Sequence, residues 1–189
     1  MTDPIRAFLA PLYQDLDGVS RFEEIDRISA IARRLHEPRD VRAFELLLLF
    51  HGLGKWLEKV GNRSRTALAT GISEAELHAI SASIRRLDDP QSDDERAVAA
   101  AVLIDSAGVR GLAERFARAR REGQSMMDVV REVLAESWIP AWVPEHARAW
   151  LERRHEARRE VCRRLLMESA LEDEERLDRL PERGRLLDP

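Results

Sequence analysis

The chain has 189 residues, a formal net charge of −4 at pH 7 and one cysteine. Its length suits a single domain with its own core, and 44% hydrophobic with 35% charged residues is typical of a soluble globular protein. No apolar stretch approaches the roughly 20 residues that a membrane-spanning helix needs. The single cysteine excludes an internal disulfide and a cysteine-rich zinc site. The negative charge argues against general nucleic-acid binding.

The N-terminal stretch "MTDPIRAFLAPLYQDLDG" contains acidic residues and lacks the basic start of a secretory signal. We therefore expect a cytoplasmic protein without a membrane anchor. We also expect a short additional helix within residues 1–18, ahead of the main fold.

Helix signals dominate the rest of the chain. In a capping box, a serine and a glutamate three residues later each bond the other residue's backbone amide at a helix start. Three such pairs occur: Ser20 with Glu23, Ser73 with Glu76, and Ser92 with Glu95. Apolar residues at helical spacing follow the first pair, which predicts a helix with one buried face. Three helix starts of this kind predict an all-α fold.

The apolar run from Phe44 to Phe50 is hydrophobic nearly all round, as in a helix that other helices enclose. A long last helix is expected from about Pro144 to Leu180, with Cys162 as a small buried side chain. We predict one domain over residues 1–176. Residues 177–189 form a charged tail that we expect to be disordered.

The stretch "LLLLFHGLGK", Leu46 to Lys55, resembles the motif "AALLHDIGK" of the HD-domain superfamily of metal-dependent phosphohydrolases. "EIDRISAIA" keeps Arg27 of the family's preceding pattern His-x-x-Arg-Val-x-x-x-Ala. "IDSAGVRGLAERF", residues 104–116, is similar to "LDAIGAIGIARAF" in one branch of the family. The resemblance covers roughly residues 20–176 and implies an HD-domain-like helical bundle.

The family's metal ligands are mostly replaced in this chain. Its first histidine is Glu24, the aspartate of its His-Asp pair is Gly52, and its late aspartate falls at Ala100 or Ala101. Only His51 is kept, and one histidine cannot hold a catalytic metal against water. The resemblance thus implies a degenerate member without a metal cofactor. Its expected role is to bind a small-molecule ligand or a protein partner, with a homodimer as one arrangement.

The alternative is an enzyme that uses the same pocket. Glu24, His51 and Asp105 would form an unorthodox site for manganese, iron or zinc, and Lys55 would bind the phosphate of a nucleotide or small phosphoester. Without a metal, His51 as general base, Glu24 as its partner and Lys55 as an anion clamp would give an acid–base enzyme.

The candidate ligand-binding residues beside this set are Arg27, His78 and Asp105. Each has a structural alternative: a lone histidine on a helix, such as His78, is more often a surface or core residue. For His51 the alternative is a ring held by the backbone or by Glu24.

Two arginine-rich stretches, residues 109–122 and 148–164, would suit phosphate contacts. Glutamates at four-residue spacing in the second stretch instead predict a solvated helix with ion pairs along it. Met126, Met127, Trp138 and Trp142 form an apolar group that we expect in the core or at a dimer seam rather than around a ligand.

Overall fold

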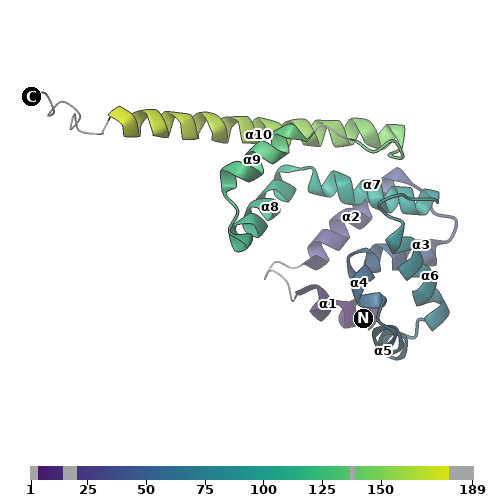
Figure 1. Cartoon of the computed structure of the whole chain (residues 1–189). Coiled ribbons are helices and arrows are strands. Elements are labelled where there is room, and N and C mark those ends of the chain that lie inside the picture. Colours follow the sequence, from purple (N-terminus) through teal and green to yellow (C-terminus); the bar gives the residue numbers. More distant parts are fainter. Residues whose placement is uncertain (1–3, 15–20, 137–138, 179–189) are drawn as a thin grey trace, which may run out of the picture. The chain divides into compact units, whose positions relative to one another are not determined.

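The computed structural model describes residues 4–14, 21–136 and 139–178. Every regular element within these residues is a helix, so the described part of the chain is all-α, as predicted (Figure 1). The chain divides into two compact units: unit 1 comprises residues 1–106 and 139–151, and unit 2 comprises residues 107–138 and 152–189. The single domain over residues 1–176 and the HD-like arrangement stay predictions.

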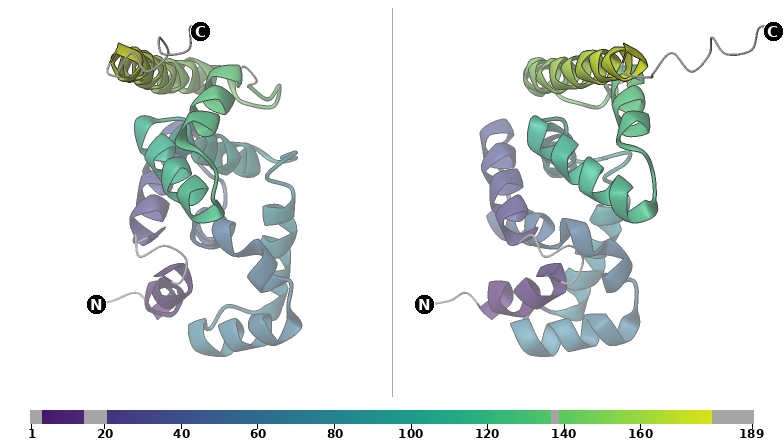
Figure 2. Two further views of the ribbon diagram at one scale, coloured as in Figure 1. Left: turned by 60° about the vertical axis from the view of Figure 1, so that its left-hand side comes forward. Right: turned by 90° about the vertical axis from the view of Figure 1, so that its left-hand side faces the viewer.

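Unit 1 contains the elements that carry the predicted site. They are α1 (Pro4–Gln14), α2 (Arg21–Leu35), α3 (Val41–Phe50), the 3-10 turn η1 (His51–Leu53), α4 (Gly54–Leu57), α5 (Val60–Thr70), α6 (Glu74–Arg85), α7 (Asp93–Ser106) and the first residues of α10 (Glu145–Asp178). Within the unit, α2 packs along α7 and α3 packs against α6, while α1 contacts α2 and α5 (Figures 1 and 2).

The predicted caps start two of these helices. Ser73 and Glu76 form a complete capping box at α6. At α7, the amide of Glu95 donates to Ser92 Oγ and the amide of Ser92 donates to Glu95 Oε2, both at 3.2 Å. The third predicted cap, Ser20, lies outside the described residues. Local sequence therefore sets two helix starts through bonds that involve only neighbouring residues.

The core of unit 1 forms around α3. Phe44 and every residue from Leu46 to Phe50 are buried, which confirms the prediction of an enclosed helix. Leu9 and Tyr13 of α1 belong to the same apolar cluster, together with Leu77 of α6. The extra N-terminal helix is therefore part of this core rather than an appendage to it.

Unit 2 contains α8 (Val109–Glu122), α9 (Met126–Ala135) and the larger part of α10. Its core includes Leu112 of α8, Val130 of α9 and Cys162 of α10, so the predicted burial of the cysteine is confirmed. Met126 is half exposed. Trp138 and the tail from residue 179 lie outside the described residues. No described helix has both the length and the apolar character that crossing a membrane requires.

Candidate functional site

His51 lies where α3 ends and η1 begins, and the residue as a whole is half-buried. Its Nδ1 lies 2.7 Å from the carbonyl oxygen of Leu48. A carbonyl oxygen can only accept a hydrogen bond, so Nδ1 carries the ring proton and Nε2 holds the lone pair of the neutral ring. The structural alternative for His51, a ring held by the backbone, is thus what the geometry shows.

The charge state of His51 follows from its surroundings. Burial lowers its pKa below 6.5, against the hydrogen bond to Leu48 and the negative charge of Asp105, which both raise it. The ring is therefore neutral at pH 7. His51 at the start of η1 is therefore near enough to α7 for the charge of Asp105 to act on its ring.

Asp105 is engaged by another predicted residue, Arg27. The guanidinium donates from Nε to Oδ1 and from Nη2 to Oδ2, each at 3.0 Å. Asp105 is only 8% exposed, and Arg27 is partly buried. This bidentate geometry is the strongest form of an arginine–carboxylate pair, and it joins α2 to α7. Both oxygens of Asp105 therefore already serve a fixed cation.

The other predicted site residues differ in how far they are buried. Glu24 lies one turn before Arg27 on α2 and is partly buried, whereas Lys55 and His78 are exposed. Ala100 and Ala101, at the positions of the family's late aspartate, are fully buried on α7.

The donor set does not fit a bound metal. Among the residues that the structure describes, no group of three or more His, Cys, Asp or Glu side chains is placed to hold a metal ion. Glu24, His51 and Asp105 are thus not gathered as ligands, and the Arg27 guanidinium occupies the carboxylate that such a site would use. A cation already bound to Asp105 also repels a second one.

Tyr13 is a residue of this site that the sequence did not indicate. Its hydroxyl donates to the carbonyl oxygen of Leu49 at 2.7 Å, and its ring meets Phe22 edge-to-face with centroids 5.8 Å apart. A Cβ at Gly52 would lie 3.1 Å from Tyr13 Cε1. The Tyr13 ring therefore lies against the backbone position where the family has its paired aspartate, although Gly52 itself stays exposed. The one available signal was that Tyr13 is the chain's single tyrosine.

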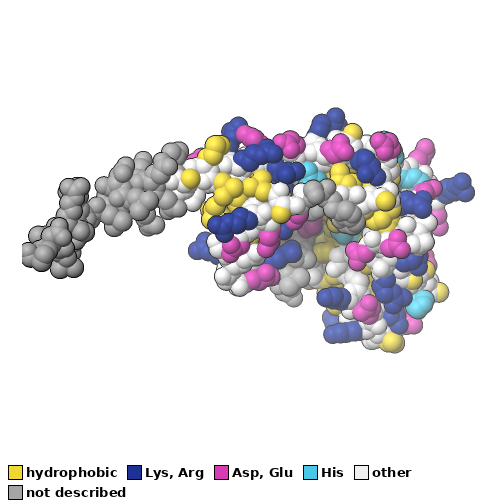
Figure 3. All heavy atoms as spheres, turned by 45° about the horizontal axis from the view of Figure 1, so that its top comes forward, with side chains coloured by type: hydrophobic (Ala, Val, Ile, Leu, Met, Phe, Trp, Pro, Cys, Tyr) yellow, Lys and Arg dark blue, Asp and Glu magenta, His cyan; other side chains and the backbone are white. Residues whose placement is uncertain are grey.

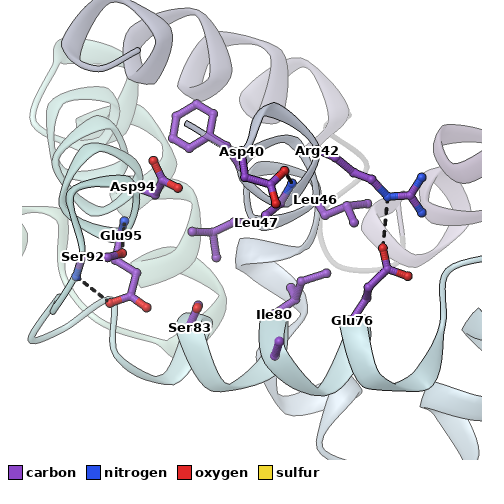
Figure 4. A pocket seen from close by; sticks show the side chains of 13 residues that line it. Asp40, Arg42, Leu46, Leu47, Glu76, Ile80, Ser83, Ser92, Asp94 and Glu95 are labelled. Atoms are coloured by element: carbon purple, nitrogen blue, oxygen red, sulfur yellow. Dashed lines mark hydrogen bonds and ion pairs between the residues drawn. The ribbon is translucent and has the colours of Figure 1, made fainter. Parts of the chain in front are cut away.

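Unit 1 also contains a cavity of about 200 Å³, lined by residues from the start of α3, from α6 and from the start of α7 (Figure 4). Its lining includes Leu47 of α3 and Ile80 of α6. Neither His51 nor any other predicted site residue belongs to it. Sequence reasoning did not find this cavity.

Several arginines of the two arginine-rich stretches pair with acidic side chains. On α10, Arg163 pairs with Glu156 at 2.7 Å and Arg164 pairs with Glu160 at 3.1 Å. Arg158 is buried and pairs with Glu136 at 2.6 Å, within unit 2. On the face drawn in Figure 3, basic and acidic side chains are interspersed. This pattern confirms ion pairs along the last helix.

Comparison of the chain with models of known protein families, with curated proteins and with solved structures found no match. The likeness to the HD domain therefore continues to rest on the motifs around Arg27, His51 and Asp105.

The lowered pKa of His51 predicts a pH dependence of stability. Around pH 6.5 the unfolded chain takes up a proton at this ring before the folded protein does, so stability falls as the pH falls through 6.5. One such group contributes at most about 1.4 kcal/mol per pH unit. We expect His51→Gln to flatten this slope in urea unfolding measured at several pH values.

His155 provides an internal comparison. Burial and the charge of Arg158 lower its pKa too, against the charge of Glu136. His155→Gln should remove a separate part of the same slope, and the double variant should remove both parts. An unchanged slope in His51→Gln would contradict the assignment of a neutral His51.

Proposed function

We propose that this chain is a degenerate HD-domain-like protein without a metal centre, which acts by binding a small ligand or a protein partner. The observation that carries the proposal is that Ala100 and Ala101 are fully buried where the resembled family has its late metal-binding aspartate. The bidentate bond from Arg27 also engages both oxygens of Asp105, the carboxylate of the alternative metal site. The ring of Tyr13 beside Gly52 supports it, since an aspartate at this position would crowd that ring.

Few metal donors remain at this site. His51 is the one kept ligand of the resemblance, and its Nδ1 is already hydrogen-bonded to Leu48. Nε2 alone gives a single bond to a metal, which water outcompetes. Hydrolysis of phosphoesters by a metal-bound water has no support in such a site, whereas binding requires no metal.

Elemental analysis tests the proposal most directly. The protein is purified without added metal, beside His51→Ala and a matched surface variant, His78→Ala. We expect substoichiometric manganese, iron and zinc in all three samples, and no hydrolysis of p-nitrophenyl phosphate. Near-stoichiometric metal that is lost in His51→Ala but kept in His78→Ala would overturn the proposal in favour of a metal-dependent phosphohydrolase.

A second candidate is a metal-independent acid–base enzyme, which the protonation of His51 favours. A neutral ring with its proton fixed on Nδ1 leaves Nε2 able to accept a proton at neutral pH. Turnover of a phosphomonoester or nucleotide that persists with a chelator present and falls in His51→Gln would favour this candidate. Turnover that is equal in both proteins would exclude His51 as the base.

A further inference from the structure

The cavity of unit 1 has an apolar wall. Phe44, Leu46 and Leu47 of α3 and Ile80 of α6 line it, and all four are otherwise buried in the core. In Figure 4 the side chains of Leu47 and Ile80 lie in the middle of the view, between the polar residues at either side. A hydrocarbon group placed against them would leave water, which favours binding of an apolar body.

The polar lining of the cavity is mainly acidic. Four carboxylates line it, those of Asp40, Glu76, Asp94 and Glu95, against one guanidinium, that of Arg42. Arg42 is itself paired with Glu76 at 3.0 Å. An anionic ligand such as a nucleotide would be repelled here, whereas a cation would be attracted.

The carboxylates are held in fixed positions. Asp40 Oδ1 accepts from the amide of Ala43 at 3.0 Å, and Asp94 Oδ1 lies 2.7 Å from His36 Nε2. In both residues the second oxygen, Oδ2, makes no hydrogen bond within the described residues. Acceptors that are already oriented lose little conformational entropy when a donor binds.

Glu95 completes this lining as a buried anion. Burial raises the pKa of Glu95. Hydrogen bonds from Arg86 and from the backbone amides of Gln91 and Ser92 together lower it by more, so the pKa lies below its usual range and the group is ionised. Its charge is balanced by Arg86, at 3.1 Å from Nε to Oε1. The two carboxylates with an oxygen to spare, Asp40 and Asp94, are therefore the ones available to a ligand.

The size of the cavity limits what it holds. Pockets for drug-sized ligands measure roughly 300–1,000 Å³. A volume of about 200 Å³ suits a smaller molecule. A short hydrocarbon with one charged head meets both the size and the division between apolar and acidic walls.

We propose that this cavity binds a small organic cation, with an ammonium or guanidinium head at Asp40 and Asp94 and a short apolar body against Leu47 and Ile80. The inference rests on the proposed function, since it names the ligand class of a chain that binds rather than hydrolyses. It places that ligand away from His51.

Titration of the isotope-labelled protein with 3-methylbutylammonium, followed by backbone amide shifts, tests the inference. The matched probes are 3-methylbutan-1-ol, which lacks the charge, and 4-methylpentanoate, which reverses it. We expect saturable shifts around Leu47, Ile80 and Asp94 with the amine, with a dissociation constant in the millimolar range or tighter. The two matched probes should bind at least about tenfold more weakly, the factor expected for about 1.4 kcal/mol of lost charge interaction.

Two pairs of variants locate the site. Asp94→Asn should weaken binding of the amine at least about tenfold. Asp93→Asn removes the same charge from the same helix turn, but the Asp93 side chain is 75% exposed and lies outside the cavity, so binding should be unchanged. Ala79→Phe, which fills the cavity from an exposed helix position, should abolish binding, and Ala75→Phe, also exposed on α6, should not. Circular dichroism confirms that each variant folds.

Equal binding of the amine and the alcohol, or undiminished binding in Asp94→Asn and Ala79→Phe, would overturn the inference. Its failure is distinguishable from that of the proposed function. The titration reports on the cavity, whereas metal content reports on His51, so either result can be negative while the other is positive.

Discussion

Arg27→Met is expected to lower the free energy of unfolding by about 3–5 kcal/mol, because it leaves a buried charge without its partner. Asp105 is nearly inaccessible, and the two bonds from Arg27, both 3.0 Å long, are its compensation. Methionine keeps much of the length and apolar stem of arginine but provides no donor. Urea unfolding at pH 7 measures the change directly.

The matched control lies on the same helix. Arg33 also makes a bidentate contact, from Nε to Oε1 and from Nη2 to Oε2 of Glu45, but its side chain is 53% exposed. Arg33→Met should therefore change stability by less than about 1 kcal/mol. The double variant Arg27→Met/Asp105→Leu should recover most of the loss, since replacing both members of a buried pair by apolar groups is often neutral.

The size of the Arg27 effect bears on the role of this residue. A loss of the expected size would identify Arg27 as a structural partner of Asp105 and withdraw both from the set of ligand-binding candidates. A loss below about 1 kcal/mol would instead mean that the pair contributes little to folding. Arg27 and Asp105 would then be available to a ligand, as the sequence predicted.

The features that were predictable from the sequence depend on neighbouring residues. The cap at Ser73 involves Glu76 alone, and the buried character of α3 is visible in its unbroken apolar run. The burial of Cys162 follows from its place among apolar residues of a helix. In each case the information lies within one helix, so no knowledge of tertiary structure is needed.

The features that were missed depend on residues far apart in the chain. Tyr13 reaches Leu49 across 36 positions, and no local pattern indicates that contact. The cavity likewise combines Asp40, the N-cap of α3, with Ile80 of α6 and Asp94 of α7. The pair between Arg27 and Asp105 spans 78 positions, and although both residues were candidates, their mutual bond was not foreseen.

Tyr13→Ala is the second variant for which we expect a large effect, a loss of about 3–5 kcal/mol in the free energy of unfolding, as for other large aromatic side chains removed from a core. Tyr13 is 4% exposed, and the substitution removes both its ring packing and its bond to Leu49. Tyr13→Phe keeps the ring and should cost about 1 kcal/mol. Thermal or urea unfolding of both variants separates the two contributions.

Coupling between variants at Tyr13 and Gly52 tests whether the tyrosine ring contacts this position. In the native protein a Cβ at Gly52 would lie 3.1 Å from the ring, so Gly52→Ala should be unfavourable or neutral. Without the ring, the same change should stabilise, as Gly→Ala does by about 0.4–1 kcal/mol where the backbone allows it. Gly61→Ala on α5, where a Cβ meets no atom within 4 Å, should stabilise the protein in both backgrounds.

Additive effects of Tyr13→Ala and Gly52→Ala would contradict the contact, because residues that touch are coupled by about 0.5–3 kcal/mol. A measured coupling would mean that Tyr13 of α1 restricts the side chain that fits at the position where a metal-binding family has its aspartate.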